Sequence, residues 1–306
     1  MLLYEQNNAQ PKTEQELIEK MSNAGIDFEP DTKVSYSNSN FALLTFILEK
    51  IYRKPYSELL EEKITIPLGL KNTYYGKKVN IKDNECNSYQ YNFNGWEIES
   101  ETDISLLLGA GGIVSTTIDL TLFSDALFNG KLITLNSLKQ MQTLKDNMGI
   151  GLLPTTFHNK VSFGQSGRID CFISFFSHSL ADNISIAIIT NGINHSFSDA
   201  TSAILRAVFN MPFDIPEFNH ELDENLDKYL GIYSSEQIPF KMSIIKNNGK
   251  LIGRLQAAGQ GAFILEATGK DKFEHASAGI IVEFNPADKT MVFKQWEGVV
   301  NFVRED

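Results

Sequence analysis

The 306-residue sequence predicts an α+β protein that is followed by a small antiparallel β-barrel. Up to about residue 143 the apolar residues recur at helical spacing, except at residues 72–106, where we expect loops and short strands. From about residue 143 to about residue 191 they recur at strand spacing. From Leu222 onward the pattern is that of strands alone. Within it, Asn247-Asn248-Gly249-Lys250 has the composition of a type I′ hairpin turn. A barrel would protect the strand edges of so short a module.

Two domains fit a chain of this length, at about 150 residues per domain. We place the first domain at residues 1–209, a linker at 210–221 and the all-β domain at 222–306. Pro212 and Pro216, together with several polar residues, mark the linker.

The first domain begins with a capping box, Thr13-Glu14-Gln15-Glu16, which opens a helix to about Met21. The next helix is expected at about 41–53, where the apolar stripe is broad enough for burial on most sides. Further helices are expected at about 56–64, from a cap at Ser115 or Thr116 to Phe128, at 136–143 and at 198–209, and strands at 148–152, 160–163, 171–178 and 184–191.

Composition excludes several classes of partner and cofactor. The net charge of −11 argues against nucleic acid and anionic membrane surfaces as partners. No apolar run reaches the ~18 residues of a membrane span, and the first residues do not resemble a secretory signal. Cys86 and Cys171 provide neither a disulfide framework nor zinc-binding spacing, so we expect two buried or partly buried thiols. We expect no metal and no cofactor.

Two motifs in the first domain point to chemistry. Tyr36-Ser37-Asn38 stands in a cluster of Ser and Asn residues before the helix at 41–53. On its own, such a cluster is typical of a helix N-cap. The second motif, Ala110-Gly111-Gly112-Ile113-Val114-Ser115-Thr116, is followed by a helix whose first turn carries Asp119.

Together these motifs resemble the serine β-lactamase and DD-peptidase family, in the class C type that has Tyr-x-Asn. The resemblance implies a β-lactamase/transpeptidase-like fold, with an antiparallel sheet flanked by helices and a helical subdomain. It also implies that Tyr36 moves protons and that Asn38 binds the substrate amide. A phenol, with a reference pKa of ~10, acts as a base near neutral pH only beside a cation. A Lys partner is therefore implied.

The family's third motif, a Lys- or His-x-Gly stretch, corresponds to Phe163-Gly164-Gln165-Ser166-Gly167-Arg168. The resemblance assigns substrate binding to Gln165, Ser166 and Gly167, and an oxyanion-binding N–H to Arg168. Gln165 stands where the family has a cation, and an amide supplies no positive charge. The local alternative is a plain turn that enters a strand.

The family's nucleophile motif, Ser-x-x-Lys, precedes Tyr-x-Asn by roughly a hundred residues, but only 35 residues precede Tyr36 here. The chain's single match, Ser243-Ile244-Ile245-Lys246, falls in a predicted strand, where its first and last side chains point to opposite faces. The five histidines suggest no triad. We therefore expect a first domain that is incomplete at its N-terminus, lacking the nucleophile helix and two strands. The chain would be a fragment of a longer product or a naturally shortened relative.

The resemblance predicts a serine hydrolase that acts through an acyl-enzyme, inactive as given because the nucleophile is absent. Its substrate would be a small molecule or peptide with an amide or ester carbonyl. The alternative is a catalytically silent binding protein that uses the cleft and the barrel. The all-β domain resembles the lipocalin-like domain appended to such hydrolases. Localisation does not follow from the chain, although a longer N-terminus would imply a periplasmic or extracellular protein.

Overall fold

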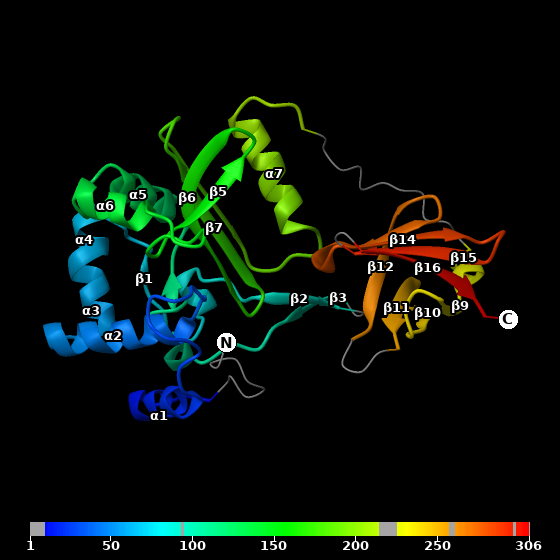
Figure 1. Cartoon of the computed structure of the whole chain (residues 1–306), viewed down its shortest axis with the longest axis horizontal. Helices are drawn as coiled ribbons and strands as arrows, with labels where there is room; N and C mark the ends of the chain where they lie inside the picture. Colours follow the sequence, from blue (N-terminus) through cyan, green and yellow to red (C-terminus); the bar gives the residue numbers. More distant parts are fainter. Residues whose placement is uncertain (1–9, 93–94, 214–224, 257–260, 296–297, 306) are drawn as a thin grey trace. The chain divides into compact units, whose positions relative to one another are not determined.

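The computed structural model describes residues 10–92, 95–213, 225–256, 261–295 and 298–305 (Figure 1). The chain forms two compact units. The first draws on Met1–Ser88 and Ile98–Asn191, and the second on Tyr89–Glu97 and Gly192–Asp306. Most of the predicted linker at 210–221 lies outside the described residues, so the domain boundaries at 209 and 222 stay a prediction.

The first unit begins with two helices that share a buried cluster. Helix α1 (Glu14–Ala24) has the predicted capping box between Thr13 and Glu16. Helix α2 (Asn38–Tyr52) is capped by Ser37, whose hydroxyl accepts from Asn40 N–H. Leu17 of α1 and Phe46 of α2 pack together with Leu106.

The remaining helical part follows the prediction with one extension. The helix expected at 56–64 runs as α3 (Tyr56–Leu60), a π-helical turn (Glu61–Thr65) and α4 (Ile66–Leu68), because Pro67 is tolerated in the first turn of α4. After this come β1 (Tyr74–Tyr75) paired with β4 (Ile113–Val114), 3₁₀ turns at Ile81–Asp83 and Ile104–Leu107, α5 (Thr117–Phe128) capped by Thr116, and α6 (Leu135–Gln142).

A four-stranded antiparallel sheet completes the first unit (Figure 1). Its strands, in spatial order, are β5 (Leu153–Phe157), β6 (Lys160–Ile169), β7 (Phe172–Ser179) and β8 (Ile184–Thr190). Helix α5 packs against β7 and β8. The prediction of a strand at 148–152 is wrong, because this segment forms a turn. Gly149 N–H donates to Leu152 O (3.0 Å), and Gly151 has a φ of 73°.

Strand β6 is longer than predicted, and it continues past the point where its pairing with β5 ends. Pairing with β5 ends at Gly164, whereas pairing with β7 continues to Ile169. Residues 165–169 therefore have no strand partner on the β5 side among the described residues. A Cβ on Gly164 would lie 1.9 Å from Phe176 O, so only glycine allows the backbones to approach here.

The second unit contains an eight-stranded closed barrel of antiparallel strands, as expected. A 3₁₀ turn (Leu226–Tyr229) precedes it, and the order around the barrel is β10-β11-β12-β13-β14-β15-β16-β9. The strands are β9 (Gly231–Ser234), β10 (Met242–Asn247), β11 (Lys250–Leu255), β12 (Phe263–Gly269), β13 (Lys272–His275), β14 (Ile280–Asn285), β15 (Thr290–Gln295) and β16 (Gly298–Arg304). The unit also holds α7 (Phe197–Val208) and the two-stranded sheet of β2 (Tyr89–Asn92) and β3 (Gly95–Ile98).

The barrel interior is a packed core. Tyr229, Met242 and Val282 are fully buried, and the rings of Phe273 and Phe284 contact Tyr229 at centroid distances of 5.0 and 4.7 Å. The Tyr229 hydroxyl donates to Asp271 Oδ1 (2.7 Å). Large side chains therefore fill the inside of the barrel, as in other small barrels.

The Ser-x-x-Lys match lies on β10, as predicted. Ser243 donates to Arg254 O (3.3 Å) on the paired strand, and Lys246 bonds to Asp227. The serine and the lysine thus have separate structural partners.

Helix α2 is only partly buried. Ala42, Thr45 and Phe46 are its only buried residues. Without the family's nucleophile helix, the apolar stripe is expected to be partly uncovered, and it is solvent-exposed, with exposed fractions of 37% to 68% for Phe41, Leu44, Leu48 and Ile51. The described part of the first unit therefore presents an apolar helix face to solvent.

We expect the Leu44→Gln/Ile51→Gln double variant to keep its free energy of unfolding within about 0.5 kcal/mol of wild type, because both side chains are already in water. Fluorescence of a bound apolar dye should fall, since its surface is removed. Phe46→Gln is the matched control, and urea titration should show a loss of about 3 kcal/mol or more for this buried ring. Equal destabilisation of both variants would contradict the exposure of this face.

Candidate functional site

The Tyr-x-Asn motif combines a helix cap with a side-chain pair. Ser37 caps α2, which agrees with the local interpretation of the cluster. The residues on either side of Ser37 are hydrogen-bonded to each other, because the Tyr36 hydroxyl donates to Asn38 Oδ1 (2.8 Å). Tyr36 is 58% exposed. The motif therefore presents a phenol and an amide, paired with each other, to solvent at the start of α2.

A glycine segment, Gly109–Gly112, connects this region to the sheet. A Cβ on Gly109, whose φ is 70°, would lie 2.1 Å from Thr45 Oγ1 and 2.6 Å from Phe41 O on α2. A Cβ on Gly111 would lie 2.9 Å from Ile169 Cδ1 at the end of β6. The segment thus contacts both the first turns of α2 and the last residue of β6. Larger residues would separate these two elements.

The third motif lies on the unpaired part of β6 and is not a turn. Gln165 is half-buried, whereas Ser166, Gly167 and Arg168 are exposed. The side-chain oxygen of Gln165 accepts the N–H of Ser166 (3.1 Å), which leaves its NH₂ group as a donor. Successive side chains of a strand alternate between faces, so Gln165 and Ser166 point to opposite sides of the sheet.

The face that carries Gln165 can be identified from its neighbours. Gln165 is opposite Phe176 on β7, and Phe176 contacts Phe123 of α5 with ring centroids 6.0 Å apart. Gln165 therefore lies on the helical side of the sheet, and Ser166 and Arg168 lie on the other side. Position 165, which corresponds to the family's Lys or His in the predicted alignment, carries the uncharged side chain of Gln165.

Two contacts near the motifs were not predicted from the sequence. Asp170, in the turn after β6, accepts from the Thr102 N–H (3.1 Å) and hydroxyl (2.6 Å). Lys145 donates to the backbone oxygen (2.9 Å) and carboxylate (3.1 Å) of Asp31, in the loop before Tyr36. Both hold loops next to motif residues, and neither pair has a recognisable spacing in the sequence.

The buried histidine His178 belongs to a polar chain but not to a catalytic triad. Its Nδ1 lies 2.9 Å from Ser185 Oγ, and Ser185 donates to Ser124 (3.0 Å). The same Nδ1 lies 3.8 Å from the Asp125 carboxylate. The ring stacks on Phe128 with centroids 4.6 Å apart. Burial lowers the pKa of His178, so the neutral form is favoured in the folded state.

Metal and membrane features are absent from the described residues. No group of three or more His, Cys, Asp or Glu in the described ranges could hold a metal ion. Among the same residues, no helix has both the length and the apolar character that crossing a membrane requires. Cys171 is half-buried, and burial raises the pKa of its thiol, whereas Cys86 is exposed, contrary to prediction. Cys86 lies in the loop just before β2, where no element covers it.

Residues 2–209 match the sequence family described as Beta-lactamase. The chain belongs to the β-lactamase family. Its fold is the predicted β-lactamase/transpeptidase-like fold, and the all-β barrel follows the matched region. The family match covers the three segments discussed above, around residues 36, 110 and 165.

Relatives of this β-lactamase-family chain include the putative penicillin-binding protein PbpX of Bacillus subtilis, 26% identical over 151 residues, which are 48% of this chain and 38% of PbpX. A solved D-amino acid amidase from Ochrobactrum anthropi, in complex with D-phenylalanine, aligns with a TM-score of 0.59 at 25% identity, over 69% of this chain and 67% of the amidase. An octameric penicillin-binding protein homologue from Pyrococcus abyssi shares the fold over 92% of this chain and 69% of its own, with a TM-score of 0.55 and 17% identity. The chain spans half or less of the length of the first two curated relatives that it matches.

We expect the first unit to lose stability as pH falls through the ordinary His range. His178 is neutral when folded, whereas an unfolded His, with a pKa near ~6.5, takes up a proton, so acid favours the unfolded state. The slope from this one site is at most about 1.4 kcal/mol per pH unit below that value. Urea titrations between pH 5 and 8, compared with His178→Gln, measure it. A variant with the same pH slope as wild type would contradict this role of His178.

Proposed function

We propose that these 306 residues recognise a small molecule or peptide through its amide or ester carbonyl, using a β-lactamase-type cleft, and do not by themselves form an acyl-enzyme. The main support is the unpaired stretch of β6 at residues 165–169, which the glycine segment links to the start of α2. An extended backbone without a strand partner offers N–H and C=O groups to a ligand.

The residues of the three motifs divide the binding work by their chemistry. The N–H of Arg168 would donate to the carbonyl oxygen, as a preorganised backbone dipole does. The NH₂ group of Gln165 and the hydroxyl of Ser166 would bind polar groups on the two sides of the strand. Asn38 would bind the substrate amide, and the Tyr36 hydroxyl, now bonded to Asn38, would bind a polar group of the ligand.

The residues of the chain support the proposed absence of covalent chemistry. An activated serine needs a base within hydrogen-bond reach. The one Ser-x-x-Lys of the sequence is on barrel strand β10, where Ser243 and Lys246 have other partners. Ser185, the serine beside a buried histidine, bonds to Ser124 in the interior of the first unit. Neither arrangement provides a nucleophile at the motif segments.

The relatives suggest the chemical class of the ligand. One is a penicillin-binding protein and another is a D-amino acid amidase solved with D-phenylalanine. We therefore propose ligands with a D-configured residue next to the recognised carbonyl, with D-amino acid amides as the simplest representatives.

The second candidate function is a catalytically silent binding protein whose biological role is recognition alone. Gln165 favours it, because an uncharged amide in place of the family's cation retains hydrogen bonding but lacks the charge that assists proton transfer. The filled interior of the barrel argues against a ligand inside that domain and leaves the barrel's outer surface for partner contact.

Incubation with a fluorophosphonate or a labelled penicillin should leave every serine unmodified, because no serine at the motif segments is paired with a base. Intact-mass spectrometry measures the label. Stoichiometric labelling of any serine would contradict the proposal, and peptide mapping would then identify the nucleophile.

D-Phenylalanine amide should bind more tightly than its L-enantiomer in calorimetric titration. Ser166→Ala and Asn38→Ala should each weaken binding up to about tenfold, the effect of one lost hydrogen bond of about 0.5–1.5 kcal/mol. Ser243→Ala, on the barrel, is the matched control and should bind as wild type does. Equal losses for Ser166→Ala and Ser243→Ala, or no preference for the D-enantiomer, would contradict the proposed site.

A further inference from the structure

The chain's crossings between its two compact units are gathered in one place. The chain leaves the first unit after Ser88 and returns at Ile98, having formed β2 and β3 within the second unit. The N–H of Glu99 donates to Ser88 O (2.9 Å), which closes this excursion at its base. Asn191, the last residue before the final crossing, donates from Nδ2 to Asn87 O (2.9 Å). Segments far apart in the sequence therefore meet at the base of β2 and β3.

Tyr91 fixes β2 to the barrel. Its hydroxyl donates to Glu266 Oε1 on β12 (2.8 Å) and accepts from Lys250 on β11. The Lys250 ammonium also lies 4.7 Å from the centroid of the Tyr91 ring. A hydrogen bond to a carboxylate and a cation–π contact thus act on the same side chain.

The β3 side is held by close packing. The rings of Tyr91 and Trp96 are 5.1 Å apart. A Cβ on Gly192, the first residue after the final crossing, would lie 2.6 Å from Tyr89 O and 2.8 Å from the Trp96 ring. Glycine at 192 allows the chain that leaves β8 to run against β2 and β3.

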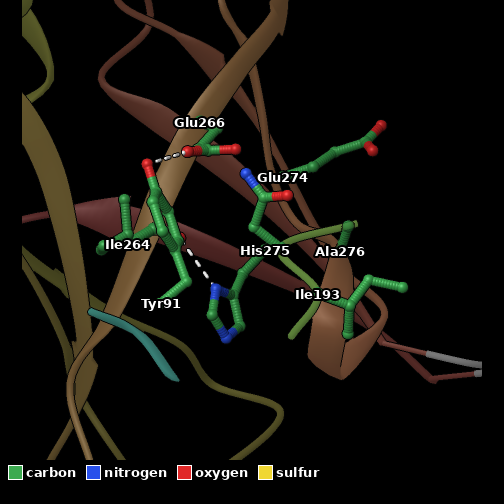
Figure 2. Close-up of a pocket in the computed structure, with 8 residues that line it drawn as sticks. Tyr91, Ile193, Ile264, Glu266, Glu274, His275 and Ala276 are labelled. Carbon is green, nitrogen blue, oxygen red and sulfur yellow. Dashed lines mark hydrogen bonds between the residues drawn. The ribbon is translucent and has the colours of Figure 1, made fainter. Parts of the chain in front are cut away.

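Figure 2 shows Tyr91 among the residues that line a small open hollow. Glu266, Glu274, His275 and Ile193 form other parts of its lining. The Tyr91 ring stands in this hollow with its hydroxyl directed to Glu266 (Figure 2). The contact of Tyr91 with the barrel is therefore partly open to water and can be broken without dismantling the barrel core.

The segment that follows β3 leads to the candidate site. Glu99 contacts the Cys171 sulfur (3.8 Å), and Thr102 makes two hydrogen bonds to Asp170. Asp170 and Cys171 form the turn that ends β6, directly after Arg168 and Ile169. If residues 98–102 are held in place, these contacts therefore also hold the end of β6 in place.

We propose that β2 and β3 act as a strap, held on the barrel by Tyr91, that orders residues 98–102 and through them the end of β6 at the candidate site. Tyr91 is in this view a positioning residue. The strap gives the barrel an influence on the binding strand through a covalent path, and it would act whether or not the strand binds a ligand.

Hydrogen exchange of the whole protein, followed by mass spectrometry, tests the strap. Tyr91→Ala should speed exchange of residues 89–92 and 98–102 by about tenfold, equal to about 1.4 kcal/mol. Tyr91→Phe, which keeps the ring and loses the bond to Glu266, should give a smaller increase. The same peptides should respond to Glu266→Gln, which weakens the same bond. Exchange in β14 and β15 should stay as in wild type.

Tyr52→Ala is the matched control, because Tyr52 also has a lysine (Lys63) over its ring, at 5.3 Å, but lies on α2. It should leave residues 89–102 unchanged. Faster exchange at 89–92 with wild-type exchange at 98–102 would overturn the proposal, since the strap would then be a local feature of the barrel. So would wild-type exchange in both segments. If Tyr91→Ala also speeds exchange in β14 and β15, the barrel itself is destabilised. The test then rests on Tyr91→Phe and Glu266→Gln, with exchange measured in the same two segments, 89–92 and 98–102.

Discussion

The candidate site depends on the close approach of the glycine segment Gly109–Gly112 to its neighbours. There is no space for a side chain at Gly109 against Thr45 and Phe41, and Gly111 packs closely against the Ile169 side chain. This contact joins the helix that carries Tyr36 and Asn38 at its start to the strand that carries Gln165 to Arg168. A polar site assembled from separate elements needs such a rigid connection, because small displacements weaken its hydrogen bonds.

The second constraint is the unequal length of neighbouring strands. Because β5 stops at Gly164 and β6 continues to Ile169, the last residues of β6 have no strand partner on the β5 side among the described residues, and the Ser166 N–H there donates to the Gln165 side chain. The turn after β6 is held by a hydrogen bond between its residue Asp170 and Thr102, which lies in the segment after β3. The end of β6, the glycine segment and Thr102 thus form one connected series of contacts within the first unit.

Much of this arrangement could be predicted from local patterns. The capping box at Thr13, the helix after the glycine segment and the hairpin at Asn248-Gly249 depend on neighbouring residues, and all three are confirmed. The errors arose where distant contacts decide the structure. The length of β6 depends on its pairing with β7, and the bond between Tyr91 and Glu266 joins residues 175 positions apart. No local period encodes such contacts. The assigned roles of Tyr36, Asn38 and the β6 residues came from family resemblance and stay predictions.

The central claim is that recognition takes place at the unpaired end of β6, beside the start of α2. The most direct measurement is backbone amide chemical-shift mapping of the isotope-labelled protein during titration with D-phenylalanine amide. The account predicts saturable shifts at Ser166, Gly167 and Arg168 and at Asn38, with the barrel strands unaffected. Shifts confined to the barrel, or shifts at neither place when the ligand is present in large excess, would contradict it.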